Sequence, residues 1–146
     1  MIHREIFSSP AENRGRIRQV GLGRIDLHVE VSRPKSFLLE HEDLQPESSQ
    51  QVRERVIAAR KIQLQRAGQT NAQMDESALK LHCHITPSDR DLLQAASKQH
   101  ALSPRACLRI LKVARTLADL EAETEIGTAH VAEAISYRNC RAMRTF

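Results

Sequence analysis

Hydrophobic residues recur along much of the chain at the three- and four-residue spacing of amphipathic helices. The first such stretch predicts a helix from about Ser49 to Arg66, opened by a Ser48/Gln51 capping box and ended at Gly68. Four further helices, with short connections between them, are expected over 75–82, 86–100 and 103–120 and from Thr128 onward. Thr86 is expected to cap the helix over 86–100, and Thr128 the last helix. The pattern therefore predicts an all-α bundle of about five helices.

The helix expected over 103–120 has the strongest signals. Ser103 can cap its first turn, and Pro104 suits the first helical position, where its missing N–H costs nothing. Apolar residues at helical spacing predict its buried face: Cys107, Ile110, Leu111, Ala114 and Leu117. The start and the inward face of this helix are thus both predicted.

Three cations, Arg105, Arg109 and Lys112, share a narrow sector on another side of the same helix. Cations held side by side repel one another, so a bound anion would relieve them. They are therefore candidates for contact with an anion or with DNA. The alternative that we weigh against this is an ordinary solvated basic face, which spacing alone favours.

A single β-strand is predicted before the helices. Apolar residues alternate with polar ones at Ile25, Leu27, Val29 and Val31, and we place the strand at residues 23–31. No second strand is predicted, so this one lacks a sheet of its own. We expect residues 1–22 to be a flexible basic segment and residues 23–146 to form the helical domain.

Composition narrows the class of protein. The chain has 146 residues, of which 40% are hydrophobic, 27% charged and only 3% aromatic. These values fit a helical globular domain better than a β-sandwich. The three cysteines form no CxxC pair, and no apolar run approaches the length of a membrane span, so we expect a cytoplasmic protein that does not enter membranes. The net charge of +4 is only mildly indicative of a polyanionic partner.

Other candidate sites are weaker. His82, Cys83 and His84 are adjacent and lack a fourth ligand at suitable spacing, so no metal site is predicted. His100 and His130 have no identifiable partner for nucleophilic catalysis. Asp89 is grouped with the acids expected to be solvated, which include Asp91, Glu121, Glu123 and Glu125.

Four blocks of the chain resemble the magnesium-chelatase-like AAA+ ATPases of the ComM/YifB family. They are Arg24 to Val31, Glu47 to Ala72, Leu102 to Leu120, and Ile126 to Arg138. In the third block, Ser103-Pro104-Arg105 and Arg109-Ile110-Leu111-Lys112-Val113-Ala114-Arg115-Thr116-Leu117-Ala118-Asp119-Leu120 resemble the family's lid helix. The resemblance implies the C-terminal lid portion of such an ATPase, preceded by a strand from the edge of the ATPase core.

The resemblance also implies roles for two arginines. Arg105 matches the sensor 2 position, which contacts the γ-phosphate of ATP. Arg24 matches an arginine finger that reaches the nucleotide of the neighbouring subunit. A planar and permanently charged guanidinium suits both tasks. In this family context, ATP and Mg²⁺ are the cofactors, and the partner is the family's ATPase core in a ring oligomer.

Motifs that bind ATP phosphates and magnesium are missing from this chain. No GxxxxGK[ST] occurs, and no apolar strand ends in paired acids. We therefore expect no enzymatic activity and no bound cofactor from this chain alone. The resemblance implies nucleotide sensing and subunit contact within an ATP-driven motor that processes DNA in natural transformation.

Two alternatives stay open beside the lid. The helices over 86–100 and 103–120 could form a helix-turn-helix that places Arg105 and Arg109 near DNA. The turn lacks the usual glycine, and Pro104 occupies the first turn of the second helix, so indirect association with DNA is favoured. The other alternative is a non-catalytic domain that joins the ring of a related ATPase.

Overall fold

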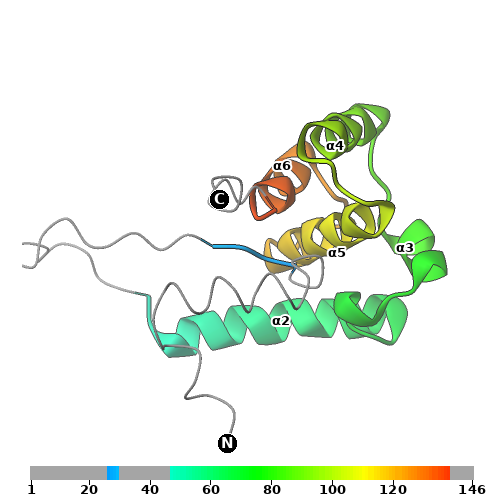
Figure 1. Ribbon diagram of the computed structural model, residues 1–146. Helices are drawn as coiled ribbons and strands as arrows, with labels where there is room; N and C mark the ends of the chain where they lie inside the picture. The colour runs from blue at the N-terminus through cyan, green and yellow to red at the C-terminus, as the bar shows by residue number, and fades with distance from the viewer. Residues whose placement is uncertain (1–25, 30–46, 139–146) are drawn as a thin grey trace, which may run out of the picture.

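The computed structural model describes residues 26–29 and 47–138, and within them the fold is all-α. Five α-helices follow in order: α2 (Ser49–Ala67), α3 (Glu76–His82), α4 (Pro87–His100), α5 (Pro104–Leu120) and α6 (Thr128–Ser136). A short 3₁₀ turn, η2 (Asn71–Gln73), links α2 to α3. In Figure 1, α5 lies between α2 on one side and α4 with α6 on the other. The predicted helical bundle is confirmed.

Local capping chemistry fixes both ends of α2. The Gln51 N–H donates to Ser48 Oγ at 3.3 Å, and the Ser48 N–H donates to Gln51 Oε1 at 2.8 Å. Both bonds satisfy donors that a helix start leaves unpaired. Gly68 ends the helix with a φ of +66°, a left-handed conformation that glycine adopts without a side-chain clash. The predicted capping box and stop are confirmed.

The core forms around α5 because its apolar stripe meets neighbours on several sides. Ile110 and Ala114 are completely buried, and Val131 of α6 is buried with them. Cys107, Leu111 and Leu117 are partly buried and pack against this core, as the predicted stripe requires. Helix α5 packs against α2, η2, α3 and α6, so it is the element on which the bundle is assembled.

Helices α4 and α6 are joined at their N-termini by a buried carboxylate, Asp89. Only 1% of Asp89 is exposed, which contradicts its expected place among the solvated acids. Its Oδ1 accepts a hydrogen bond from Thr128 Oγ1 at 2.6 Å, and its Oδ2 accepts one from Thr86 Oγ1 at 2.7 Å. These two hydrogen bonds lower the pKa of Asp89 below its ordinary value, and the bond from Thr128 has the larger effect.

The start of α6 depends on His130, for which sequence reasoning found no partner. Gly127 occupies the cap position expected for Thr128, and its N–H donates to His130 Nδ1 at 2.9 Å. Because Nδ1 accepts, the proton of the neutral ring is on Nε2, which lies 2.9 Å from Glu121 Oε2. A glycine has no side chain to cap the helix, so the histidine three residues later takes that part.

Residues 26–29 lie against the C-terminal end of α6. The His28 N–H donates to the Tyr137 carbonyl oxygen at 2.9 Å. No strand is assigned to these four residues, and the remainder of the strand predicted at 23–31 lies outside the described part of the chain. The same applies to the segment 1–22 and to Arg24. Within the described residues, no helix is long and apolar enough to cross a membrane.

Candidate functional site: a basic groove along α5

The candidate site is positioned by the N-terminal turn of α5. Ser103 Oγ accepts a hydrogen bond from the Ala106 N–H at 3.3 Å, and Pro104 is the first helical residue, both as predicted. This start places Arg105 in the first turn, where its side chain is exposed. Within the described residues, Arg105 takes part in no hydrogen bond or ion pair.

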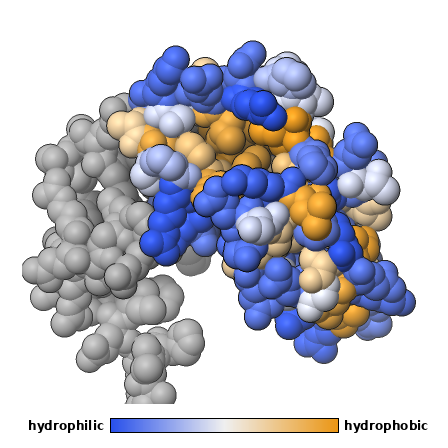
Figure 2. All heavy atoms as spheres, turned by 90° about the vertical axis from the view of Figure 1, so that its right-hand side faces the viewer, coloured by the Kyte–Doolittle hydropathy of each residue, from blue (hydrophilic) through white to orange (hydrophobic). Residues whose placement is uncertain are grey.

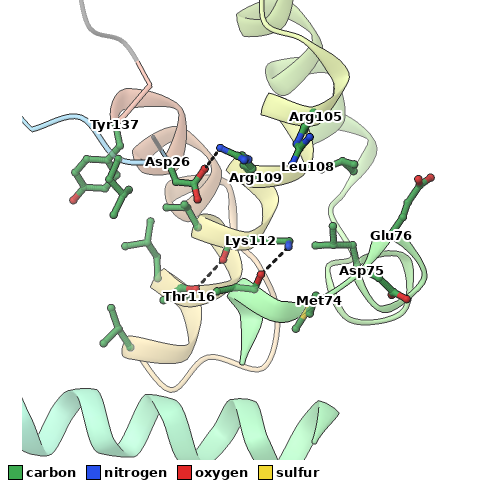
Figure 3. Close-up of a pocket in the computed structure, with 16 residues that line it drawn as sticks. Asp26, Met74, Asp75, Glu76, Arg105, Leu108, Arg109, Lys112, Thr116 and Tyr137 are labelled. Atoms are coloured by element: carbon green, nitrogen blue, oxygen red, sulfur yellow. Dashed lines mark hydrogen bonds and ion pairs between the residues drawn. The ribbon is translucent and has the colours of Figure 1, made fainter. Parts of the chain in front are cut away.

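A groove of about 870 Å³ runs along α5 beside Arg105. Apolar residues line much of it, among them Leu108, Val113, Leu117 and Leu120 of α5. Figure 3 shows Arg105, Arg109 and Lys112 following one another along the helix at this groove. Acids of other segments also line it: Asp26, Asp75 and Glu76. The predicted cationic sector therefore faces a recess with an apolar wall.

The three cations of the groove differ in their surroundings. Arg109 Nη1 lies 2.8 Å from Asp26 Oδ1, and its side chain is only 18% exposed. Lys112 Nζ donates to the Ala72 carbonyl oxygen at 3.0 Å. Both interactions are visible in Figure 3, where the Arg105 side chain stands without a dashed line. Arg109 and Lys112 thus hold neighbouring segments of the chain, whereas Arg105 has its donors directed to solvent.

Behind the groove lies a buried cluster of charges centred on Asp119, which the sequence reasoning missed. Its Oδ2 accepts from Arg66 Nη2 at 2.9 Å and from Asn71 Nδ2 at 2.7 Å, and its Oδ1 accepts from Arg115 Nε at 3.1 Å. Burial alone would raise the pKa of Asp119, but these hydrogen bonds and the two guanidinium charges outweigh burial and lower it. The cluster fixes α2 and η2 to α5.

Arg115 closes this cluster on the side of the α5–α6 connection. Its two terminal nitrogens donate to the carbonyl oxygens of Thr124 and Glu123 at 2.9 Å and 2.6 Å. Its side chain is 2% exposed, so all three of its donor groups are used within the protein. Arg115 and Asp119 belong to the stretch that resembles the family's lid helix, but the resemblance implied no contact between them.

Cys83 lies in the core and has no reactive character. Burial raises the pKa of its thiol to about 11, against the attraction of the nearby Arg115 and Arg66 charges. The thiol is therefore protonated at neutral pH, whereas a nucleophile or a metal ligand must be the thiolate. No group of three or more His, Cys, Asp or Glu residues in the described ranges is arranged to hold a metal ion. His82, Cys83 and His84 lie in these ranges and form no such group.

Comparison with known proteins gives this geometry a family. The model for the C-terminal region of the magnesium chelatase subunit ChlI matches residues 46–138. Over 117 residues the chain is 41% identical to the competence protein ComM of Haemophilus influenzae and 38% identical to the uncharacterised protein YifB of Escherichia coli. An uncharacterised protein of Mycobacterium tuberculosis is 35% identical over 127 residues.

These matches cover most of this chain and a small part of each relative. They span 80% of the chain and 23% of ComM and of YifB, and 84% of the chain and 25% of the mycobacterial protein. The matched helices are the ones that build the groove and the Asp119 cluster. The chain belongs to the magnesium chelatase ChlI C-terminal family and corresponds to that domain of the ComM/YifB-type proteins.

Proposed function

We propose that this chain acts as the helical lid of a ComM-type AAA+ ATPase, in which Arg105 senses the nucleotide and the bundle contacts neighbouring subunits. The observation that carries the proposal is the position of Arg105. It is exposed in the first turn of α5, next to a groove, and unlike Arg109 and Lys112 it is bonded to no other described residue. The partial positive charge of a helix start favours a phosphate at this end.

The chain's own residues do not form a complete site for ATP or Mg²⁺. The sequence has no GxxxxGK[ST] loop to cradle phosphates, and the described residues contain no metal-binding group of acids. In the proposed assembly, the ATPase core of the motor holds ATP and Mg²⁺, and this lid supplies Arg105. The matching role for Arg24, as a finger toward the nucleotide of an adjacent subunit in the ring, is part of the same proposal.

An indirect association with DNA fits this proposal better than direct reading of DNA by α5. The side chain of Arg109 is mostly buried beside Asp26, and Lys112 donates to a backbone carbonyl. A recognition helix needs several side chains that reach base edges or phosphates. Of the three candidates on α5, Arg105 has the greatest freedom to do so. We therefore propose that the motor, rather than this lid, contacts DNA.

The decisive experiment measures ATP hydrolysis by a chimera. Residues 46–138 of this chain replace the matching part of Haemophilus influenzae ComM, and Arg105→Ala is compared with Arg90→Ala, an exposed arginine on α4. We expect Arg105→Ala to lower kcat at least about tenfold, because a preorganised donor to the reacting phosphate is lost. Arg90→Ala should leave kcat unchanged.

Both variants should fold, because both side chains are exposed, and circular dichroism of the isolated chain checks this. Arg105→Lys separates charge from shape, since an ammonium keeps the charge and loses the planar fork. We expect the lysine variant to fall between the wild type and Arg105→Ala. Equal kcat values for Arg105→Ala and Arg90→Ala would refute the sensor role.

A further inference from the structure

Helix α2 carries an exposed row of alternating cationic and apolar residues that the lid proposal does not use. Arg53, Ile57, Arg60 and Leu64 are spaced four, three and four residues apart, and we call them the α2 seam. Ile57 is 60% exposed and Leu64 is 45% exposed. Both arginines are exposed, and neither is bonded to another described residue.

The seam lies on a different side of α2 from the surface that packs on the bundle. Ala59 and Gln63 are the buried residues of this helix. At 3.6 residues per turn, the seam is centred roughly 110° around the helix from them. Figure 1 shows α2 at the edge of the bundle, with α5 on one side only. The apolar residues of the seam are thus not part of the described core.

The spacing of the seam is that of one helix packing lengthwise on another. Positions four and three residues apart keep one side of a helix facing a partner, as in coiled coils. Ile57 and Leu64 are seven residues apart, as are Arg53 and Arg60, so like residues repeat at about 10.5 Å along the axis. A partner helix with the same period would meet an apolar residue and a cation in turn.

We propose that the α2 seam docks an amphipathic helix of another protein, one that carries glutamate or aspartate opposite Arg53 and Arg60. The exposed Ile57 and Leu64 favour a protein over a nucleic acid, because phosphate contacts need no apolar side chains. A membrane surface is disfavoured, because arginines alternate with the apolar residues within one narrow face instead of flanking a broad one.

A second copy of the chain offers no such helix within the described residues. Each described helix has at most one exposed acid, such as Glu54, Asp91 or Glu133, whereas a partner for Arg53 and Arg60 needs two on one face. The inference is independent of the sensor role, because Arg105 and the groove are on α5 and take no part in the seam.

The test uses the full chain and a designed helical peptide as the probe. A fluorescein-labelled peptide of about 21 residues carries Leu and Glu alternately at four- and three-residue spacing, and its companion carries Lys in place of Glu. Fluorescence anisotropy measures binding to both. We expect the Glu peptide to bind the wild-type chain at least about tenfold more tightly than the Lys peptide.

Charge exchange makes the test specific for the seam. Arg53→Glu with Arg60→Glu should weaken the Glu peptide at least about tenfold and make the Lys peptide the better ligand. The matched control is Arg90→Glu with Lys98→Glu, two exposed cations on α4, and it should keep the wild-type preference. Ile57→Ser should weaken both peptides, since it removes apolar burial from the interface. Circular dichroism confirms that each variant is folded.

Several outcomes would overturn the proposal. One is equal binding of the two peptides by the wild-type chain, and another is equal loss in the seam and control variants. Sedimentation equilibrium shows whether the chain self-associates. If it does, and Ile57→Ser abolishes the self-association, the seam is a contact between two copies of the chain. The wild-type chain could also bind duplex DNA or phosphatidylserine vesicles. If the seam variant loses that binding and the control variant keeps it, the seam is a surface for DNA or for a membrane instead.

Discussion

Asp89 gives the bundle a pH dependence whose sign follows from its hydrogen bonds. The hydroxyls of Thr128 and Thr86 donate to its carboxylate and lower its pKa. A carboxyl whose pKa is lower in the folded chain adds stability above the unfolded pKa of about 4. That stability is lost as the pH falls through the folded pKa. We therefore expect unfolding to become easier in acid, in part because of this one residue.

The measurement is the midpoint of thermal unfolding from about pH 7 to about pH 3, followed by circular dichroism. Asp89→Asn should be less stable than the wild type at neutral pH, and its midpoint should fall less across this range. Asp91→Asn, an exposed acid on the same helix, serves as the control and should follow the wild type. Parallel curves for Asp89→Asn and the wild type would contradict the prediction.

Single residues were predictable where the signal is local. The exposure of Arg105 and the inward position of Ile110 follow from helical spacing, and both are confirmed. The Asp119 cluster was not predicted, because Arg66 and Asp119 are 53 positions apart and meet only when α2 packs on α5. Asp89 was misjudged for the same reason, since its partner Thr128 lies 39 positions away. Periodicity identifies a face but not the charge that lies opposite it.

At the scale of elements, helix starts were more predictable than the interactions between helices. Ser48, Thr86 and Ser103 each cap the helix that the sequence assigns to them. A cap is a bond between residues three apart, so a short stretch of sequence contains all of it. The exception is α6, where Gly127 is the cap and the His130 ring does the bonding. No simple cap signal exists for a glycine whose partner is a histidine.

Two helix ends lead to a paired prediction. Gly68 after α2 and Ala101 after α4 both have left-handed backbones, with φ of +66° and +50°. An alanine there places its Cβ too close to a carbonyl oxygen, at a cost of about 1 kcal/mol, whereas glycine avoids this cost. Gly68→Ala should therefore lower the free energy of unfolding by about 1 kcal/mol, and Ala101→Gly should raise it by about 0.5 kcal/mol.

Urea denaturation measures both changes. Beyond the local backbone, a Cβ at Gly68 would meet nothing within 4 Å, so a loss there reports local backbone strain and not a clash with the rest of the fold. Gly127→Ala is the matched control, because Gly127 has a φ of −88° and its nearest neighbour to a new Cβ is 3.6 Å away. We expect a smaller loss than for Gly68→Ala, because the φ of Gly127 lies in a region that alanine adopts without strain. If both glycine variants lose the same stability, backbone handedness is not the cause.

For the molecule as a whole, the core and the family match define nearly the same unit. The buried hydrophobic residues that form the core lie between Met74 and Ile135, and α2 is fixed to them through the Asp119 cluster. The family model spans 46–138. The start predicted for the helical domain at residue 23, where the family resemblance begins, lies outside the described residues. Residues 26–29 contact this unit through the ion pair of Asp26 with Arg109 and the hydrogen bond from the His28 N–H to the Tyr137 carbonyl oxygen.

Shortened chains test the limits of this unit. A chain beginning at Glu47 loses the ion pair of Arg109 with Asp26, a half-exposed partner, which is worth about 1 kcal/mol or less. We expect it to unfold cooperatively, with a thermal midpoint within about 8 °C of that of the full chain. A chain beginning at Asn71 also lacks Arg66, and so removes one of the two cations that the buried Asp119 faces.

Asp119 then keeps Arg115 but loses Arg66, so its buried charge is only partly compensated, which costs up to about 3 kcal/mol. The chain beginning at Asn71 should therefore lose most of its cooperative transition in calorimetry, although every residue from Met74 to Ile135 in the hydrophobic core is retained. Equal midpoints for the two shortened chains would show that α2 adds nothing to the fold. Loss of the transition in the longer one would show that residues before Glu47 belong to the unit. The expected result, stable with α2 and unstable without it, would show that the long helix, which the Asp119 cluster fixes to the bundle, belongs to the folded unit.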